Sequence, residues 1–493
     1  MKRFALLILL TSSIVTLYAQ NTLSIEECRK LAMEHNRSIM IAKEKADVAT
    51  ELRKAAFTQF LPNFSANGTY LFNQKNISLM SEDALLPIGT KMADGSFGFR
   101  QDQVKNQWVQ VSPGVYAPLD ASGKPFDPKA EPGKIIWKDY AVLPKEALEM
   151  DVKNVFAGTV GFVQPVFMGG KVRELYKMAK SGERLANIEQ ERAADELIID
   201  VDEAYWRVVS LENKRKLAQE YCLLMEKLVK NVGIMVEEGV ATKGDVLKVS
   251  VKLNEAQMML AKADNGLRLS KMALFQICGL EINSNYTLSE SNLTGYNDIN
   301  PVRPTDSLIE NRAEIRALNE AKKIAGSNLK IMESRFMPNL LLSGNYIVSN
   351  PNVYNGVSNS FAGMFSVGVG INIPIFHFGE RIHTLHAAKS QVKIVQYQID
   401  EAKEKIELQV NQFGFRTDEA RRRLAMAEKS VEKADENVRF ANEAFDAGLI
   451  GSTDLMEAQT AWLMANSEKI DSKIDVKMCE LYLKKAIGES LVK

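Results

Sequence analysis

Acidic side chains stand just after two glycine residues that lie far apart in the chain. Asp454 and Glu457 follow Gly448 and are three residues apart, so on a helix they share one face. Paired carboxylates attract cations, although acidic residues also occur in the first turn of ordinary helices because they complement the helix dipole. Asp245 follows the other glycine, Gly239, in the same way. Lys248 stands three residues after Asp245 and partly neutralises its charge.

The sequence contains no recognisable motif for an enzyme active site. It contains no phosphate-binding loop, no GxGxxG dinucleotide fingerprint, no nucleophile elbow and no HExxH zinc motif. His377, His383 and His386 are close in sequence, but a zinc site needs further ligands and a closed shell, so we expect a polar role at an interface. Lysine plus arginine and aspartate plus glutamate both number 62, so no basic excess attracts nucleic acid. We expect no enzyme, no cofactor, no metal and no nucleic-acid partner.

Two long tracts, residues 166–300 and 375–493, contain no proline. Because proline breaks a helix interior at a cost of about 3 kcal/mol, each tract can be continuous helix. Apolar residues recur there at alternating steps of three and four, which is the coiled-coil repeat. The stretches 170–239 and 379–448 would each form a helix roughly 100 Å long. Each ends at a glycine suited to a C-terminal cap and restarts near an N-cap residue, so the sequence predicts two long helical hairpins.

Shorter segments alternate apolar residues with small or polar ones, as a strand with one apolar face does. Such a strand suits a membrane barrel or a soluble sandwich. No segment after the N-terminal run is apolar enough for a membrane helix, so a membrane form of this chain would enter by strands. Four strands cannot close a barrel, because the smallest membrane barrels have eight, whereas three copies would supply twelve. The expected strands lie near 61–73, 154–167, 338–349 and 361–376.

The chain also repeats itself. The Phe60–Asn63 motif FLPN recurs as FMPN at Phe336–Asn339, and the turn at 164–170 recurs at 373–379. That turn and the glycine at the end of the long helix both recur at an offset of 209 residues, so the helix between them keeps its length. We expect two equivalent halves that complete each other's core.

The N-terminus is typical of a secretory signal. Lys2 and Arg3 precede an apolar run from Phe4 to Leu17, and the residues that follow suit cleavage after Ala19. The run is shorter than the about 20 residues of a membrane anchor. No cysteine follows the cleavage site, so lipid attachment is not expected there.

The cysteines show no metal-type spacing. We favour the interpretation that they are buried free thiols. A disulfide is possible in an oxidising compartment, but nothing in the sequence pairs them. The residues concerned are Cys28, Cys222, Cys278 and Cys479.

Taken in order, these features resemble the TolC-type outer membrane efflux proteins. The resemblance covers nearly all of the chain after the signal, including both strand starts at proline, the turn at 164–170 and both hairpin tips. It implies a homotrimer whose strands form one twelve-stranded barrel in outer membrane lipid, continued by a helical tunnel across the periplasm. It also implies that the tips meet a periplasmic adaptor, or membrane fusion protein, docked on an inner-membrane transporter.

The resemblance assigns roles to the tip residues. Asp454 and Glu457 match positions where the family places acidic rings that line the periplasmic entrance, and Asp245 is the first-half equivalent. A trimer would bring six of the second-half carboxylates around one axis. The residues that match adaptor-contacting tips, unless they are simple helix-ending turns, are Gly239, Val240, Gly448 and Leu449.

The chain departs from the family at one place, and its two halves differ at another. Ile450 and Phe445 stand where the prototype has basic and tyrosine residues that lock the closed state, so no lock is carried over. The segment 73–153, rich in proline and glycine, has no counterpart of similar length in the second half. There, residues 349–360 connect the two expected strands. The place of 73–153 between two strands, opposite the helices, puts it at the cell surface as a long loop. It is either a lid over the pore or a mobile insertion.

We therefore expect a mainly α fold with a small membrane β part, built from a duplicated strand-strand-hairpin unit. The function is the exit duct of a tripartite efflux or type I secretion system in a Gram-negative outer membrane, with a large periplasmic portion. The alternative is a soluble periplasmic coiled-coil scaffold or adaptor, which leaves the strands unexplained. The expected parts are a signal peptide at 1–19, a first repeat at 20–300 with a hairpin at 170–279 and its tip near 239, and a second repeat at 301–493 with a hairpin at 379–488 and its tip near 448.

Overall fold

The computed structural model describes residues 22–91, 93, 97–98, 100–284, 286–289, 306–354, 358–489 and 491. The expected signal peptide, 1–19, lies outside these residues. The chain divides into two compact units. One consists of Met1–Thr58, Met168–Met337 and Ile373–Lys493, and the other of Gln59–Phe167 and Pro338–Asn372.

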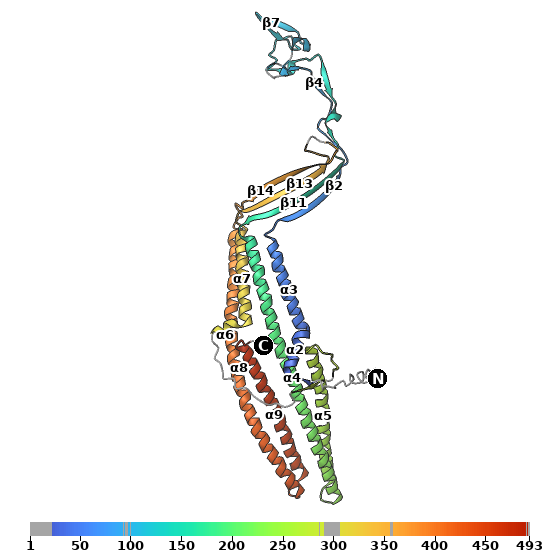
Figure 1. Cartoon of the computed structure of the whole chain (residues 1–493), viewed down its shortest axis with the longest axis vertical. Coiled ribbons are helices and arrows are strands. Elements are labelled where there is room, and N and C mark those ends of the chain that lie inside the picture. Colours follow the sequence, from blue (N-terminus) through green and yellow to red (C-terminus); the bar gives the residue numbers. More distant parts are fainter. Residues whose placement is uncertain are drawn as a thin grey trace, which may run out of the picture. The chain divides into compact units, whose positions relative to one another are not determined.

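The first unit is helical, and its longest helices lie where the proline-free tracts predict them (Figure 1). α4 and α8 have 67 residues each, and α5 and α9 have 35 each. The expectation of a mainly helical fold is confirmed. The helices are α2 (Ile25–His35), α3 (Arg37–Thr58), α4 (Lys171–Glu237), α5 (Lys243–Ile277), α6 (Asp306–Asn311), α7 (Ala313–Ser334), α8 (Glu380–Asp446) and α9 (Ser452–Ala486).

These helices form a layer with two edges. α4 contacts α3, α5, α7 and α9, whereas α8 contacts α7 and α9. α3 and α5 therefore lie along one edge of the layer and α8 along the other. Figure 1 shows α4 with α5 as one hairpin and α8 with α9 as a second hairpin beside it.

The second unit contains a four-stranded sheet with the order β14-β13-β11-β2. Its strands lie close to the expected segments, although β14 ends at Asn372, before Pro374. β2 pairs antiparallel with β11, and β13 pairs antiparallel with β14. The outer strands, β2 and β14, have no neighbour on one side in this sheet. The strands are β2 (Asn63–Phe72), β11 (Asn154–Met168), β13 (Asn339–Asn350) and β14 (Ala362–Asn372).

One face of this sheet is aromatic and exposed. The ring of Phe64 lies 5.8 Å from that of Phe162, and Tyr70 lies 4.9 Å from Phe156. Phe162 also covers Gly344, since a Cβ atom at that glycine would meet the phenyl ring at 2.5 Å. The glycine in β13 therefore makes room for a large side chain of the neighbouring strand.

The expectation that 73–153 is a long loop was wrong. Short strands pair across it, and Val104, Pro118 and Phe126 are buried in a small core. Sequence reasoning missed these pairs because each strand is only two to five residues long. They are β3 (Ile77–Ser78) with β10 (Glu149–Met150), β4 (Ala84–Pro87) with β9 (Tyr140–Leu143), β5 (Thr90–Lys91) with β6 (Phe97–Gly98), and β7 (Trp108–Ser112) with β8 (Val115–Pro118).

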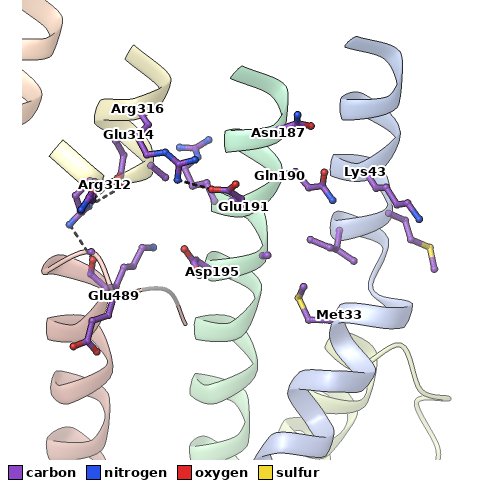
Figure 2. A pocket seen from close by; sticks show the side chains of 18 of the residues that line it. Met33, Lys43, Asn187, Gln190, Glu191, Asp195, Arg312, Glu314, Arg316 and Glu489 are labelled. Atoms are coloured by element: carbon purple, nitrogen blue, oxygen red, sulfur yellow. Dashed lines mark hydrogen bonds and ion pairs between the residues drawn. The ribbon is translucent and has the colours of Figure 1, made fainter. Parts of the chain in front are cut away.

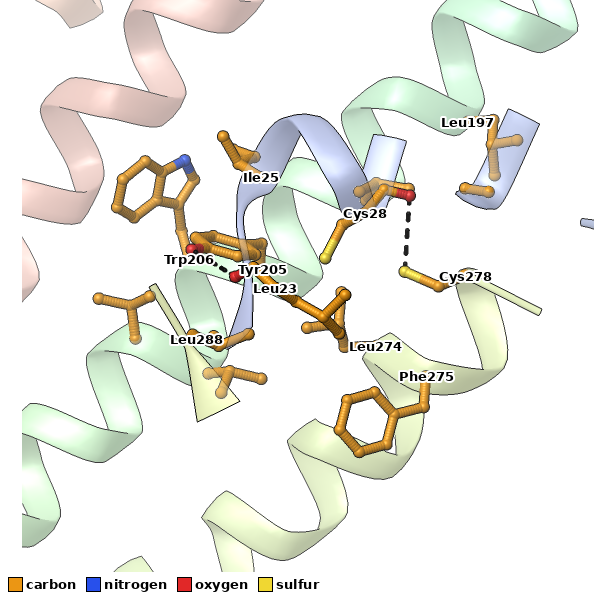
Figure 3. Packing of buried hydrophobic residues seen from close by; sticks show 14 of the residues in the cluster. Leu23, Ile25, Cys28, Leu197, Tyr205, Trp206, Leu274, Phe275, Cys278 and Leu288 are labelled. Carbon is orange, nitrogen blue, oxygen red and sulfur yellow. Dashed lines mark hydrogen bonds between the residues drawn. The ribbon is translucent and has the colours of Figure 1, made fainter. Parts of the chain in front are cut away.

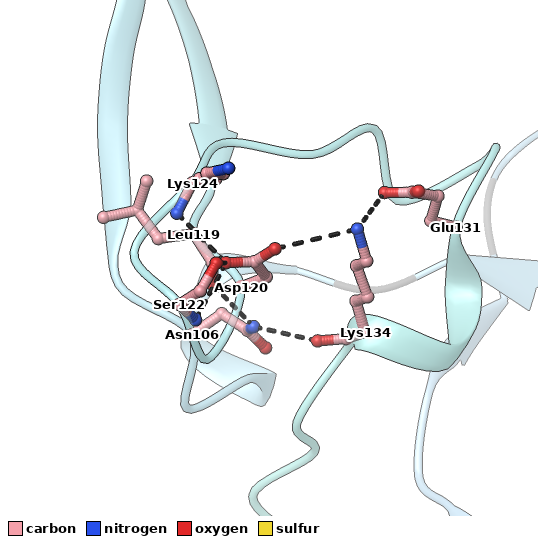
Figure 4. A network of polar contacts seen from close by, with 7 residues as sticks. All are labelled: Asn106, Leu119, Asp120, Ser122, Lys124, Glu131 and Lys134. Atoms are coloured by element: carbon pink, nitrogen blue, oxygen red, sulfur yellow. Dashed lines mark hydrogen bonds and ion pairs between the residues drawn. The ribbon is translucent and has the colours of Figure 1, made fainter.

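Polar contacts among residues 106–134 hold the middle of this insertion together (Figure 4). Asp120 Oδ1 accepts hydrogen bonds from the hydroxyl of Ser122 at 2.7 Å and from the backbone N–H of Lys124 at 3.0 Å. These bonds hold the pKa of Asp120 at about 2. The buried amide of Asn106 donates to the carbonyls of Leu119 and Lys134 and so joins segments that are distant in sequence.

Candidate functional site: the hairpin tips

Both hairpins end in the same turn, which places the predicted tip residues. Gly239 has φ of 77° and Gly448 has φ of 73°, a backbone region that glycine enters without steric cost. The N–H of Val240 donates to the carbonyl of Met235, and that of Gly239 to Val236. The same two bonds recur at the second tip, from Leu449 and Gly448. This is the Schellman pattern, which satisfies the last carbonyls of the helix.

An apolar side chain stands exposed at each tip. Val240 keeps 70% of its surface accessible and Leu449 keeps 78%. Large apolar side chains of this kind gain free energy when a partner covers them, at about 1.5–3 kcal/mol each. The glycine of each pair sets the turn, and the residue after it presents the apolar surface.

The acidic residues begin the returning helices. Asp454 and Glu457 are both exposed in the first turns of α9. Asp454 Oδ2 accepts the backbone N–H of Gly451 at 3.2 Å, so this carboxylate also caps the helix. Asp454 therefore acts as an ordinary capping residue at the start of α9. The Glu457 carboxylate lies on the same exposed face and does not cap the helix.

Asp245 has a different environment at the first tip. Its Oδ2 accepts from the hydroxyl of Thr242 at 2.7 Å, and Lys248 Nζ lies 3.6 Å from Oδ1. The hydroxyl of Thr242, its backbone N–H and the lysine hold the pKa of Asp245 below its ordinary value. The predicted partial neutralisation by Lys248 is present, so the two tips differ in charge although they share a backbone.

A buried apolar cluster supports both tips. It joins Met225, Val232 and Val249 of the first hairpin to Phe445 and Leu455 of the second. Phe445, one of the two residues at the family's lock positions, is therefore a core residue with 5% exposure. Ile450 packs against the same cluster.

Polar contacts also join the two hairpins. Lys214 Nζ of α4 lies 2.7 Å from Asp471 Oδ1 of α9, and the hydroxyls of Tyr221 and Thr460 are 3.2 Å apart. Sequence reasoning had no signal for these pairs, because their members are more than 200 residues apart.

A hollow of about 1030 Å³ lies among α3, α4, α7 and the end of α9 (Figure 2). Its arginines already have partners, since Arg316 Nη1 lies 2.7 Å from Glu191 and Arg312 Nη2 lies 2.8 Å from Glu314. Paired charges leave these arginines poorly placed to recognise a charged ligand, so we assign no site to this hollow.

The histidines do not assemble into a metal site. His377 packs edge-on against the ring of Phe336, with centroids 6.0 Å apart. In the part of the chain that the structure describes, no three His, Cys, Asp or Glu side chains gather as metal ligands would. Among the described helices, none has the length and apolar character required to cross a bilayer.

Several solved outer membrane channels have this fold. The Campylobacter jejuni CmeC outer membrane channel superposes with a TM-score of 0.71 at 15% identity, over 94% of this chain and 86% of that one. The open state of the Neisseria gonorrhoeae MtrE outer membrane channel gives 0.70 at 17% identity, over 95% and 89%. The fold, with its paired hairpin tips and open-edged sheet, is thus that of the outer membrane channels.

Sequence comparison identifies the family to which the chain belongs. A model of the outer membrane efflux protein family matches residues 143–280 and 305–489, which is more than half of the chain. The chain therefore belongs to the outer membrane efflux protein family and is an efflux channel. It is 22% identical to the alkaline protease secretion protein AprF of Pseudomonas aeruginosa, over 65% of this chain and 67% of AprF. It is 20% identical to the outer membrane protein TolC of Vibrio cholerae, over 59% and 67%.

Proposed function

We propose that three copies of this chain form one outer membrane duct, which passively conducts substrates received from a periplasmic adaptor and an inner-membrane transporter. The observation that carries the proposal is the pair of uncovered edges on the helical layer. α8 lines one edge, and α3 with α5 lines the other. A head-to-tail contact between unlike edges closes into a ring when the rotation between copies allows it.

Exposed apolar side chains recur along the middle of α8, with charged residues such as Glu401 and Glu404 between them. These apolar side chains recur at steps of eleven and seven residues, spacings that return to one helix face. Exposed apolar side chains on one helix face are the kind of surface that a second copy would cover. The residues are Tyr397, Leu408, Phe415 and Met426.

The opposite edge carries matching stripes. On α3 they are Ile41, Val48 and Leu52, and on α5 they include Leu247, Val251 and Met258, all exposed. Steps of four, seven and eleven keep each set on one helix face. Apolar rows on both edges support a coiled-coil contact between neighbouring copies.

The two outer strands of the sheet also support an assembly of three copies. These strands are β2 and β14, and their apolar side chains are exposed. Unpaired strand edges are not tolerated in lipid, so each β2 would pair with the β14 of the next copy. Three copies would give twelve strands, and four strands alone would close nothing.

Phe415→Asp tests the ring. Phe415 is 75% exposed in one copy. Burial of a phenylalanine contributes about 1.5–3 kcal/mol, and the aspartate would add an unpaired charge at each of the three contacts. We expect the variant to run as a monomer in detergent on size exclusion with light scattering, while Phe415→Leu stays trimeric. A trimer of unchanged stability from Phe415→Asp would contradict this interface.

The tips are the proposed adaptor contact, because Val240 and Leu449 expose apolar surface on rigid turns. The double change Val240→Asp, Leu449→Asp keeps both glycines and should leave the trimer intact. We expect export by the host to fall close to that of a strain lacking the chain, and cysteine crosslinking from the tips to the adaptor to disappear. The control Val240→Ile, Leu449→Ile retains export. Normal export by the aspartate variant would remove the tips from the adaptor contact.

The two halves of the chain are proposed to be repeats, spanning 20–300 and 301–493 after a signal peptide at 1–19. In support, both long helices start after a glycine, Gly170 with φ of 86° and Gly379 with φ of 87°, and have equal lengths. The insertion 73–153 belongs to the first repeat only and is proposed to lie outside the cell. The soluble scaffold that the helices alone would allow is not favoured by the family match.

A further inference from the structure

Two buried thiols meet in the core of the helical unit, although 250 residues separate them (Figure 3). Cys28 lies in α2 and Cys278 is the residue that ends α5, and both have 0% exposure. The Sγ of Cys278 lies 3.6 Å from the carbonyl oxygen of Cys28 and donates to it. Both belong to one apolar cluster built from α2, α4 and α5.

The ends of α2 and α5 are held together independently of the cysteines. The amide of Asn36 donates to the carbonyl of Ile277 at 2.8 Å. Gly279 packs so closely that a Cβ atom there would lie 2.5 Å from the Cβ of His35. The strand β1 (Thr22–Leu23) also pairs in parallel with β12 (Thr287–Leu288), which follows α5. The approach of the two thiols is thus fixed by the surrounding packing.

We propose that Cys28 and Cys278 form a disulfide in the exported protein, which ties the N-terminal segment to the end of the first hairpin. The proposal rests on the proposed periplasmic location of the helical unit, since disulfides persist in that compartment. All four cysteines are free thiols in this structure. Cys222 and Cys479 lie outside this cluster, so both are expected to stay as thiols in the exported protein.

The oxidant is a protein disulfide of the periplasm, and the exchange proceeds in two steps. A thiolate of one cysteine attacks the oxidant's disulfide, forms a mixed disulfide and releases one thiolate of the oxidant. The second cysteine loses its proton and attacks the first sulfur, which forms the Cys28–Cys278 bond and releases the oxidant's other thiolate. The chain loses two electrons and two protons, and the oxidant becomes a dithiol.

The bond must form before folding is complete. The hydrogen bond with Cys278 and burial raise the pKa of the Cys28 thiol well above its usual range, whereas the same hydrogen bond lowers the pKa of Cys278. Full burial of both thiols excludes a protein oxidant. The pairing passes over Cys222, which lies between the two cysteines in sequence and reaches the periplasm before Cys278 does.

Peptide mapping tests the proposal on protein purified from outer membranes without reductant, after free thiols are blocked with N-ethylmaleimide at lysis and again on denaturation. The four cysteines lie in four different tryptic peptides. We expect a linked pair, one peptide ending at Arg29 and one starting at Met272, which separates on reduction, and blocked Cys222 and Cys479. Complete blocking of all four cysteines, or a link from Cys28 to Cys222, would overturn the proposal.

Stability provides a second readout. The double change Cys28→Ser, Cys278→Ser should lower the melting temperature of the trimer by about 5–10 °C relative to Cys222→Ser, Cys479→Ser, and reductant should narrow the difference. An equal difference with and without reductant would mean lost packing only and would contradict the disulfide. The trimer is sized in the same samples. Free thiols in an outer membrane trimer would overturn the disulfide alone, whereas free thiols with no membrane trimer would overturn the proposed location as well.

Discussion

The double change Asp454→Asn, Glu457→Gln is expected to abolish the cation selectivity of the channel and its block by divalent cations. Three copies would bring six exposed carboxylates to the proposed entrance. Neutralising them removes the attraction for cations, while the side-chain amide introduced by Asp454→Asn can still accept the N–H of Gly451, as the carboxylate does. In planar bilayers the reversal potential under a salt gradient should move from the cation side to near zero.

Ionic strength separates an entrance effect from a folding effect. Charges are screened over about 10 Å at 0.1 M salt and over about 3 Å at 1 M. The difference between wild type and the double variant should therefore be large at low salt and small at high salt. The double change Asp245→Asn, Lys248→Met is the matched control, because it removes both members of that pair and leaves the net charge of the first tip unchanged. Unchanged selectivity in Asp454→Asn, Glu457→Gln would show that these two carboxylates do not line the pathway.

Arg29→Met is expected to produce the largest loss of folding stability among single changes in the helical unit. Arg29 Nε and Nη2 donate to the two carboxylate oxygens of Asp202, at 2.7 and 2.5 Å, and the Asp202 side chain is only 4% exposed. Removing one partner of a buried pair costs about 3–5 kcal/mol, and we expect the lower part of that range because Arg29 itself is 32% exposed while the Asp202 charge stays buried and uncompensated. Denaturant unfolding of detergent-solubilised trimers measures the loss.

The loss in Arg29→Met should grow as the pH rises. Burial already raises the pKa of Asp202 above its ordinary value, against the opposing effect of Arg29. A carboxyl that binds its proton more tightly in the folded state stabilises the fold at low pH, and that stabilisation is lost as the pH rises through the folded-state pKa. Without Arg29 this pKa rises further, so the variant should be closer to wild type at pH values of about 5 than at about 8.

The paired change Arg29→Met, Asp202→Leu is the control for this prediction. It removes both charges together and leaves no unpaired group, so it should recover much of the stability lost in Arg29→Met. Equal instability of the single and the double variant at every pH would mean that shape, and not charge, explains the effect.

Local patterns in the sequence were enough to predict the long helices and the strands of the four-stranded sheet. α4 and α8 lie in proline-free tracts with a coiled-coil repeat, and their glycine caps mark both tips. β2 and β14 lie in segments whose apolar residues alternate. Each of these signals is set by residues within a few positions of one another, which is why it can be read without a structure.

Contacts between distant residues could not be predicted in this way. Cys28 with Cys278 and Arg29 with Asp202 meet because α2 packs beside α4 and α5. The insertion 73–153 has the composition of a loop because its strands are short and its core is small. At the tips, the position of Asp454 was predictable, whereas its capping bond depends on the turn that precedes it.

Single-channel recording from protein extracted from outer membranes tests whether this chain is a conduit. Trimers are sized first and then inserted into planar bilayers, with the Lys214→Ala, Asp471→Ala variant alongside wild type, because that pair joins the two hairpins. Removing this contact should let the two hairpins move apart, so we expect discrete cation-selective conductance steps that are larger in the variant than in wild type. Inserted trimers that carry no current in either protein would contradict the assignment of this chain as a conduit.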